Sequence, residues 1–317
     1  MRLARPLPTL TMAITLVAGL LIGAPPVHAA EGGGSNYAPG LYGDFGVAVA
    51  PEPGFYLRQD LYSYSGDGGG TLFTEFGEIR ADLEVDAATY ILNGLKALDR
   101  EVLGGRYAFG AALPVVYADL SADVIVGQTA VSIDKDRTAF GDLSVIPVSL
   151  FWNFGNLHLN VYESIIAPTG SYDPNRDVDA GLNYWSFDTN VALTYLHPKR
   201  GFEVSFDLGH IYNTENSDTD YQTGQEIHLD YMVNKFLSDT FALGVQGFVY
   251  EQITGDSGSG ALLGDFEGEA AGIGAALMWT TKVKKTDLTI GVKWLHEYHT
   301  EKRLEGDHLY LNFTFSL

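Results

Sequence analysis

The strongest constraint on the fold is an alternation of apolar and polar residues with a period of two. From Trp185 to Tyr195, every odd position holds an apolar, aromatic or threonine residue, and the even positions hold Ser, Asp, Asn, Ala and Thr. Segments 202–209, 227–233 and 309–317 repeat this alternation. Because successive side chains of a strand point to opposite faces, each stretch predicts a β-strand with one apolar face. No stretch shows a convincing helical period of 3.6 residues, so the chain is predicted to be all-β.

Short and long connections alternate along the chain of predicted strands. The alternation predicts twelve strands, at 55–65, 79–95, 105–120, 139–154, 156–167, 183–197, 201–213, 224–236, 240–254, 269–283, 286–299 and 307–317. Connections after even-numbered strands are mostly short. Those after odd-numbered strands are generally longer and rich in Gly, Ser, Asn and Asp, as at 121–138, 168–182, 214–223 and 255–268. An even strand number, with short turns and both termini at one end, is typical of outer-membrane β-barrels.

The predicted fold is therefore a transmembrane antiparallel β-barrel of about twelve strands over residues 54–317. The strand lengths fit the roughly 9–11 tilted residues that cross a bilayer. In lipid a closed barrel is required, because an open sheet edge would leave backbone groups unpaired. We expect the protein in the bacterial outer membrane, in contact with membrane lipid and lipopolysaccharide. The C-terminal strand, ending at Leu317, has the pattern that barrel-assembly machinery reads.

The first 53 residues divide into two predicted segments. Arg2 and Arg5, the apolar run 10–22 and the small-residue site at 27–29 predict a signal peptide over residues 1–29. Residues 30–53 carry Tyr37 and other aromatic side chains before the first strand. They are interpreted either as a plug that folds back into the lumen or as a loose periplasmic tail, and the aromatic residues slightly favour the plug.

Composition excludes several classes of function. The chain has 40 acidic and 19 basic residues, a formal net charge of −21, and no cysteine. Nucleic-acid binding needs a basic surface, so it is not expected. The lack of cysteine excludes disulfides, thiolate metal sites and cysteine nucleophiles. A mean hydropathy of +0.02 is high for so acidic a chain. The alternation explains it, because one face of each strand meets lipid and the other meets water.

A familiar pattern of short motifs runs through segments 156–160, 167–172, 181–185, 194–196, 201–205, 213–216 and 219–224, with 35–40 and 247–252 outside this stretch. In these motifs the chain resembles the outer-membrane barrel family named for the meta-pathway of phenol degradation. The family is described as transporter-like. The resemblance implies a barrel that passes hydrophobic or aromatic compounds, and it supplies no functional residues.

Parity predicts which side chains line the lumen. The predicted set is Arg58, Asp60, His158, Asn160, Asp188, Asn190, Glu203, Asp207, Glu226, His228, Asp230 and Gln246. Rings of acidic side chains favour cations, so a polar, cation-favouring lumen is expected. Arg58 is expected to form an ion pair with nearby carboxylates. The alternative is that these groups only fill and hydrate a barrel interior.

Two short motifs resemble chemical sites. Residues 255–258, Gly-Asp-Ser-Gly, resemble a serine-protease nucleophile signature, but the sequence places no histidine beside them, and no catalytic residue is predicted. Asp173, Asn175, Asp177 and Asp179 alternate like calcium ligands. However, Val178 stands where an EF-hand needs glycine, so a solvated acidic loop is favoured over a cation site. No metal or cofactor is predicted.

The predicted function is an outer-membrane channel that admits small hydrophobic or aromatic compounds by passive diffusion, without enzymatic activity. The alternative is a structural or adhesive barrel whose acidic loops bind partners and whose lumen does not transport.

Overall fold

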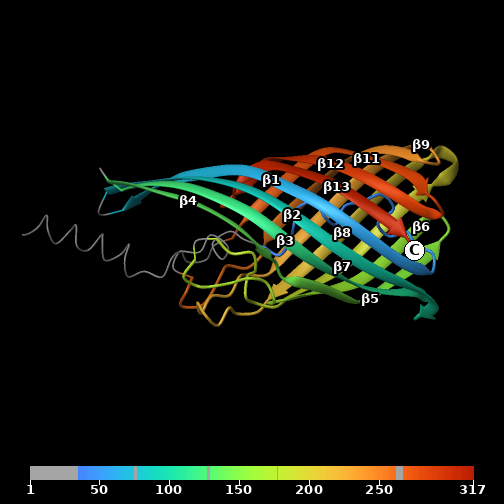
Figure 1. The fold of residues 1–317 in the computed structure, drawn as a ribbon, viewed down its shortest axis with the longest axis horizontal. Coiled ribbons are helices and arrows are strands. Elements are labelled where there is room, and N and C mark those ends of the chain that lie inside the picture. Colours follow the sequence, from blue (N-terminus) through green and yellow to red (C-terminus); the bar gives the residue numbers. More distant parts are fainter. Residues whose placement is uncertain (1–34, 75–76, 127–128, 177, 262–266) are drawn as a thin grey trace, which may run out of the picture.

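The computed structural model describes residues 35–317 apart from 75–76, 127–128, 177 and 262–266, so the predicted signal peptide lies outside the described residues. The described chain forms one antiparallel sheet of thirteen strands that closes on itself (Figure 1). The strands are β1 (Gly54–Thr74), β2 (Gly77–Val102), β3 (Gly105–Val126), β4 (Thr129–Phe140), β5 (Leu143–Phe154), β6 (Leu157–Ala167), β7 (Ser186–His197), β8 (Phe202–Asn213), β9 (Glu226–Ser238), β10 (Phe241–Gln252), β11 (Glu269–Val283), β12 (Thr286–Glu301) and β13 (Glu305–Ser316).

Closure of the barrel depends on β1, which pairs with both β2 and β13. On the other side of β2, β3 pairs with β4 along its second half and with β5 along its first half. β4 and β5 thus occupy one place in the wall, and the barrel has twelve strands in circumference, as predicted. One helical turn, Pro198–Arg200, links β7 to β8. None of the helical segments in the described part of the chain could span a membrane.

The predicted single strand 139–154 is wrong, because Gly141 and Asp142 separate β4 from β5. The Asp142 carboxylate accepts hydrogen bonds from the amides of Gly170 and Leu182, each at 2.7 Å. Because these loop amides bind the Asp142 side chain, the loop packs against this position, and the regular strand pairing is interrupted between β4 and β5.

The predicted connections after the first and third strands are also wrong. β1 and β2 remain paired to Thr74 opposite Gly77, and β3 and β4 remain paired to Val126 opposite Thr129. Glycine-rich stretches such as 66–70 read as loops, but neighbouring strands supply their backbone hydrogen bonds. We call this projecting part of β1–β4 the extended sheet. It reaches beyond the other strands at the left of Figure 1.

Short turns close the opposite end of the barrel. Leu103 and Gly104, between β2 and β3, both have positive φ, at 53° and 76°. Such angles match the twist of a tight β-hairpin. At this end the last strand meets the first, since the Leu317 amide donates to the Phe55 carbonyl at 2.8 Å.

Exposure alternates along the strands as the period of two predicts. Val191 and Leu208 are 45% and 49% exposed, whereas their neighbours Asn190 and Asp207 are fully buried. Apolar residues of this kind cover the outside of the wall. An apolar exterior on a sheet without free edges is suited to lipid, so this is a membrane-spanning barrel.

Candidate functional site: the barrel interior

Residues 35–53, which we call the N-terminal segment, lie against the inner side of the wall. Their contacts to acidic side chains come from β9 and β8. The Tyr37 hydroxyl donates to Asp230 at 2.7 Å, and the Gly43 amide donates to the same carboxylate at 3.2 Å. The Gly46 amide donates to Glu203 at 2.9 Å. Asp230 and Glu203 are both buried, so these hydrogen bonds anchor the segment to the wall.

Basic and phenolic groups from the other side of the interior bind the carbonyl groups of the segment. The Lys293 Nζ donates to the carbonyls of Gly40 and Gly43 at 2.6 Å and 2.5 Å. The Tyr310 hydroxyl donates to the Pro39 carbonyl at 2.6 Å. Gly40 has φ +81°, and a Cβ there would lie 2.2 Å from the Leu295 side chain, so glycine is required at this close approach.

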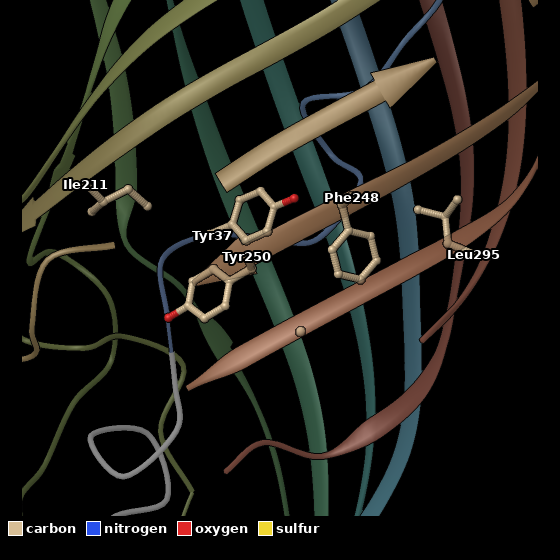
Figure 2. Packing of buried hydrophobic residues seen from close by; sticks show 6 residues of the cluster. Tyr37, Ile211, Phe248, Tyr250 and Leu295 are labelled. Carbon is tan, nitrogen blue, oxygen red and sulfur yellow. The ribbon is translucent and has the colours of Figure 1, made fainter. Parts of the chain in front are cut away.

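An apolar and aromatic cluster surrounds Tyr37 inside the barrel (Figure 2). The Tyr37 ring stacks on His228 with ring centroids 4.3 Å apart and on Tyr250 at 5.7 Å. Phe248 and Leu295 complete the cluster with buried side chains. This cluster was not predicted from the sequence, although the alternation of inward and outward residues along β10 and β12 indicates part of it. Phe248 and Leu295 each lie between outward-facing neighbours and therefore point inward.

The structure places the twelve predicted lumen residues on the inner wall but in two groups. All of them except Arg58 are buried. Most belong to β7, β8 and β9, beneath the N-terminal segment. There Asp207 lies directly opposite Asp230, and the His228 Nε2 is 3.2 Å from Asp188. Gly209 provides the space, since a Cβ at this position would lie 2.0 Å from the His228 ring.

Arg58 forms the expected internal ion pair. Its guanidinium lies 2.7 Å from Asp60 and 2.5 Å from Asp44 of the N-terminal segment. Asn93 donates a further hydrogen bond to Asp60 at 2.7 Å. Arg58 therefore connects the segment to the β1 side of the wall.

The remaining interior is a cavity of about 910 Å³. Its lining comes from the N-terminal segment, β1, β2, β3, β5, β6 and the last strands, and includes Tyr62, Ile91, Val116, Ile146 and Ile166. Of the predicted lumen residues, only Arg58, Asp60 and Asn160 line it. Apolar and tyrosine side chains outnumber the others on this lining, which also carries charged groups such as Arg58, Asp60 and Glu297. Glu203 and Asp230, which bind the N-terminal segment, do not line the cavity.

The Gly-Asp-Ser-Gly motif at 255–258 lies in a loop whose side chains form hydrogen bonds to a neighbouring loop. Asp256, in the protease-like Gly-Asp-Ser-Gly string, accepts hydrogen bonds from Tyr221, from Gln252 at 2.6 Å and from the Gly224 amide at 2.9 Å. These contacts tie the β10–β11 loop to the β8–β9 loop. Ser259 also hydrogen-bonds to Asp220, which lowers the pKa of that carboxyl below its usual value.

In the acidic loop that contains Asp173, Asn175 and Asp179, two carboxylates form ion pairs with Arg176 of the same loop. Arg176 lies 3.3 Å from Asp173 and 2.9 Å from Asp179. Asp177 lies outside the described residues. Within the ranges that the structure describes, no group of three or more acidic, histidine or cysteine residues could hold a metal ion.

Comparison with known proteins identifies relatives over most of the barrel. The model of the family described as "Putative MetA-pathway of phenol degradation" matches residues 64–313. No curated protein sequence matches the chain significantly. An outer membrane channel from Pseudomonas putida F1 has a TM-score of 0.62 at 16% identity, covering 86% of this chain and 98% of that one.

Two further structures are less alike. The β domain of the Bordetella autotransporter Brka has a TM-score of 0.43 at 11% identity, covering 83% of this chain and all of that one (100%). A Pseudomonas aeruginosa FadL homologue has a TM-score of 0.40 at 9% identity, with coverages of 92% and 96%. The likeness to the P. putida channel shows the fold, a closed antiparallel barrel. That relative is described as an outer membrane channel.

Proposed function

The chain belongs to this phenol-degradation family, and we propose that it is a channel through which small hydrophobic or aromatic compounds cross the outer membrane by passive diffusion. The observation that carries the proposal is the 910 Å³ cavity within a membrane-spanning barrel, lined mainly by apolar and tyrosine side chains. Ligand sites for apolar molecules have this character, with few polar groups that fix orientation.

The cavity suits an uncharged solute better than an ion. A neutral aromatic molecule loses little on leaving water for such a lining, and transfer of its surface is favourable. An ion would lose hydration, and the carboxylates of Asp44 and Asp60 on the lining are already paired with Arg58. The P. putida relative is a channel, which supports the same function, and the family's link to phenol degradation supports an aromatic solute.

The N-terminal segment is proposed to act as a plug, within the predicted segment 30–53. Support comes from its anchoring to Asp230, Glu203 and Lys293, which lie on three different strands. With the segment in place, acidic residues of β7–β9 are withdrawn from the cavity. Ions would then pass poorly, while the cavity on the β1–β6 side stays available to neutral solutes.

The surroundings of the barrel follow from the same proposal. The apolar exterior is expected to contact outer-membrane lipid and the acidic loops to lie among lipopolysaccharide head groups. The last strand, β13, is expected to be read by the barrel-assembly machinery. Passive diffusion needs no catalytic step, and the structural role of Asp256 supports a function without enzymatic activity.

Uptake by intact cells tests the proposal. Cells lacking the protein and cells carrying it would be given isotope-labelled toluene at limiting concentration, and initial uptake rates would be compared. We expect faster uptake with the protein present. Equal rates, with the folded barrel verified by heat-modifiable gel migration, would refute the channel function.

A further inference from the structure

The two faces of the extended sheet have opposite chemistry. Its outer face carries carboxylates at Asp82, Glu84, Asp86, Asp119, Asp123, Asp134 and Asp136. Its inner face carries half-buried or buried apolar side chains at Leu83, Val85, Ala87, Ala118, Leu120, Ala122 and Ile133. This is the reverse of the membrane-spanning wall, where the apolar side faces outward and the acidic residues face inward.

The acidic outer face places the extended sheet outside the hydrocarbon of the membrane. Going along β2, the outward residues change from Leu92 and Tyr90, which are 39% and 36% exposed, to Asp86 and Glu84. Across the strands, Asp86 lies opposite Asp119, which lies opposite Asp136. Directly opposed like charges destabilise a sheet, and they can remain ionised only where water or hydrated head groups surround them.

The inner face is continuous with the cavity. Val85 lies directly opposite Leu120, and Leu83 lies opposite Ala122. Further along the same strands the next inward residues are Thr89 and Ile91 of β2 and Val116 and Pro114 of β3, all of which line the cavity. An apolar track therefore runs from the extended sheet, outside the hydrocarbon, into the cavity.

From this continuity we propose that the inner face of the extended sheet is a capture face, which binds neutral aromatic molecules from outside and guides them into the cavity. The inference rests on the proposed channel function. The preference for aromatic rings comes from β4, where Lys135 lies opposite Leu120 and Arg137 lies opposite Ala118 on the inner face. Cations beside an apolar strip attract the faces of aromatic rings. The outer carboxylates present no comparable surface, so capture is confined to the side that leads inward.

Cysteine labelling tests the capture face, since the chain contains no cysteine of its own. Val85→Cys reports the inner face, and Glu84→Cys, its neighbour on the outer face, is the matched control. Each full-length variant, in outer-membrane preparations, would be alkylated with a water-soluble maleimide with and without toluene. We expect toluene to slow alkylation at position 85 several-fold and to leave position 84 unchanged. No protection at position 85, or equal protection at both positions, would overturn the proposal.

Uptake separates failure of the capture face from failure of the channel. Val85→Thr combined with Leu120→Thr places threonine, which suits a strand, at both positions while removing apolar surface, and folding would be verified by heat-modifiable migration. We expect toluene uptake to fall about tenfold at limiting concentration, and Glu84→Gln to have no effect. Unchanged uptake in the double variant refutes the capture face alone. Absence of any uptake advantage for the wild-type protein over the deletion strain refutes the channel itself.

Discussion

The barrel interior has two halves that differ in what fills them. Beside β7–β10 the interior is occupied by the N-terminal segment, packed on buried acidic and aromatic side chains. Beside β1–β6 it is hollow, and the lining is mostly apolar or tyrosine. Both halves belong to one closed sheet with the same strand geometry. In the filled half, buried charged groups bind backbone groups of the segment, whereas in the hollow half Arg58 is paired with Asp60 and Asp44 and most of the lining is uncharged.

The inner wall binds both the N–H groups and the C=O groups of the N-terminal segment. Carboxylates of Asp230 and Glu203 accept from backbone amides, while the Lys293 ammonium binds backbone carbonyls. A segment without regular secondary structure has unpaired backbone groups that must be satisfied when it is buried. The filled half of the interior therefore needs its charged residues to bind the buried backbone of the segment.

Removal of the segment is expected to have the largest effect. Deleting residues 35–48 should expose Asp230, Glu203 and Asp188 to water and join the two halves into one wide lumen. We expect ionic conductance in planar bilayers to rise several-fold and to become cation-selective. Full-length protein in the same bilayers is the control. An unchanged conductance would show that the segment does not separate the two halves.

A smaller effect is expected when one anchor is weakened. Asp230→Asn removes the charge that holds Tyr37 and Gly43, at a cost of about 1–3 kcal/mol to the seated position of the segment. The matched control is Asp207→Asn, since Asp207 lies opposite Asp230 and accepts from Tyr162 of the wall. More frequent opening events in single-channel recordings are expected for Asp230→Asn. Equal behaviour of the two variants would contradict the anchoring role.

Lys293→Met is expected to have a similar or slightly smaller effect. It leaves the carbonyls of Gly40 and Gly43 without their donor, while methionine fills much the same volume as lysine. Protease cleavage within the segment, measured on intact cells or purified barrels, should become faster. Cleavage as slow as in the wild-type protein would show that Lys293 does not hold the segment.

The smallest effect is expected at an exposed ion pair. Lys282 lies 2.8 Å from Asp287, at the end of the barrel with short turns. Exposed pairs contribute about 0–1 kcal/mol, so Lys282→Met should leave both protease cleavage and conductance unchanged. A change equal to that of Lys293→Met would mean that loss of positive charge, rather than loss of the anchor, produces the effect.

The sequence predicts the wall better than its contents. Alternation such as that of Val191 and Asn190 is a local property of a strand, so the barrel and its inward side chains could be predicted from it. The extended sheet could not, because the glycines at 66–70 become strand only through hydrogen bonds from neighbouring strands. The break at Asp142 depends on loop amides from Gly170 and Leu182.

The division of the interior into a filled half and a hollow half also could not be predicted from the sequence. It depends on contacts between Tyr37 and Asp230, residues far apart in the chain. The aromatic residues before the first strand favoured a plug, but they did not indicate which side of the barrel it would fill. Parity places a residue inside or outside and carries no information about position around the circumference.

Blocking the hollow half tests the proposed path most directly. Ala112 of β3 lines the cavity, and its neighbour Leu113 faces outward and is 39% exposed. Initial uptake of labelled toluene would be measured in intact cells carrying the wild-type protein, Ala112→Trp or Leu113→Trp, all verified as folded barrels. The predicted result is a several-fold loss of uptake for Ala112→Trp and none for Leu113→Trp. Undiminished uptake with tryptophan at position 112 would contradict passage through the hollow half.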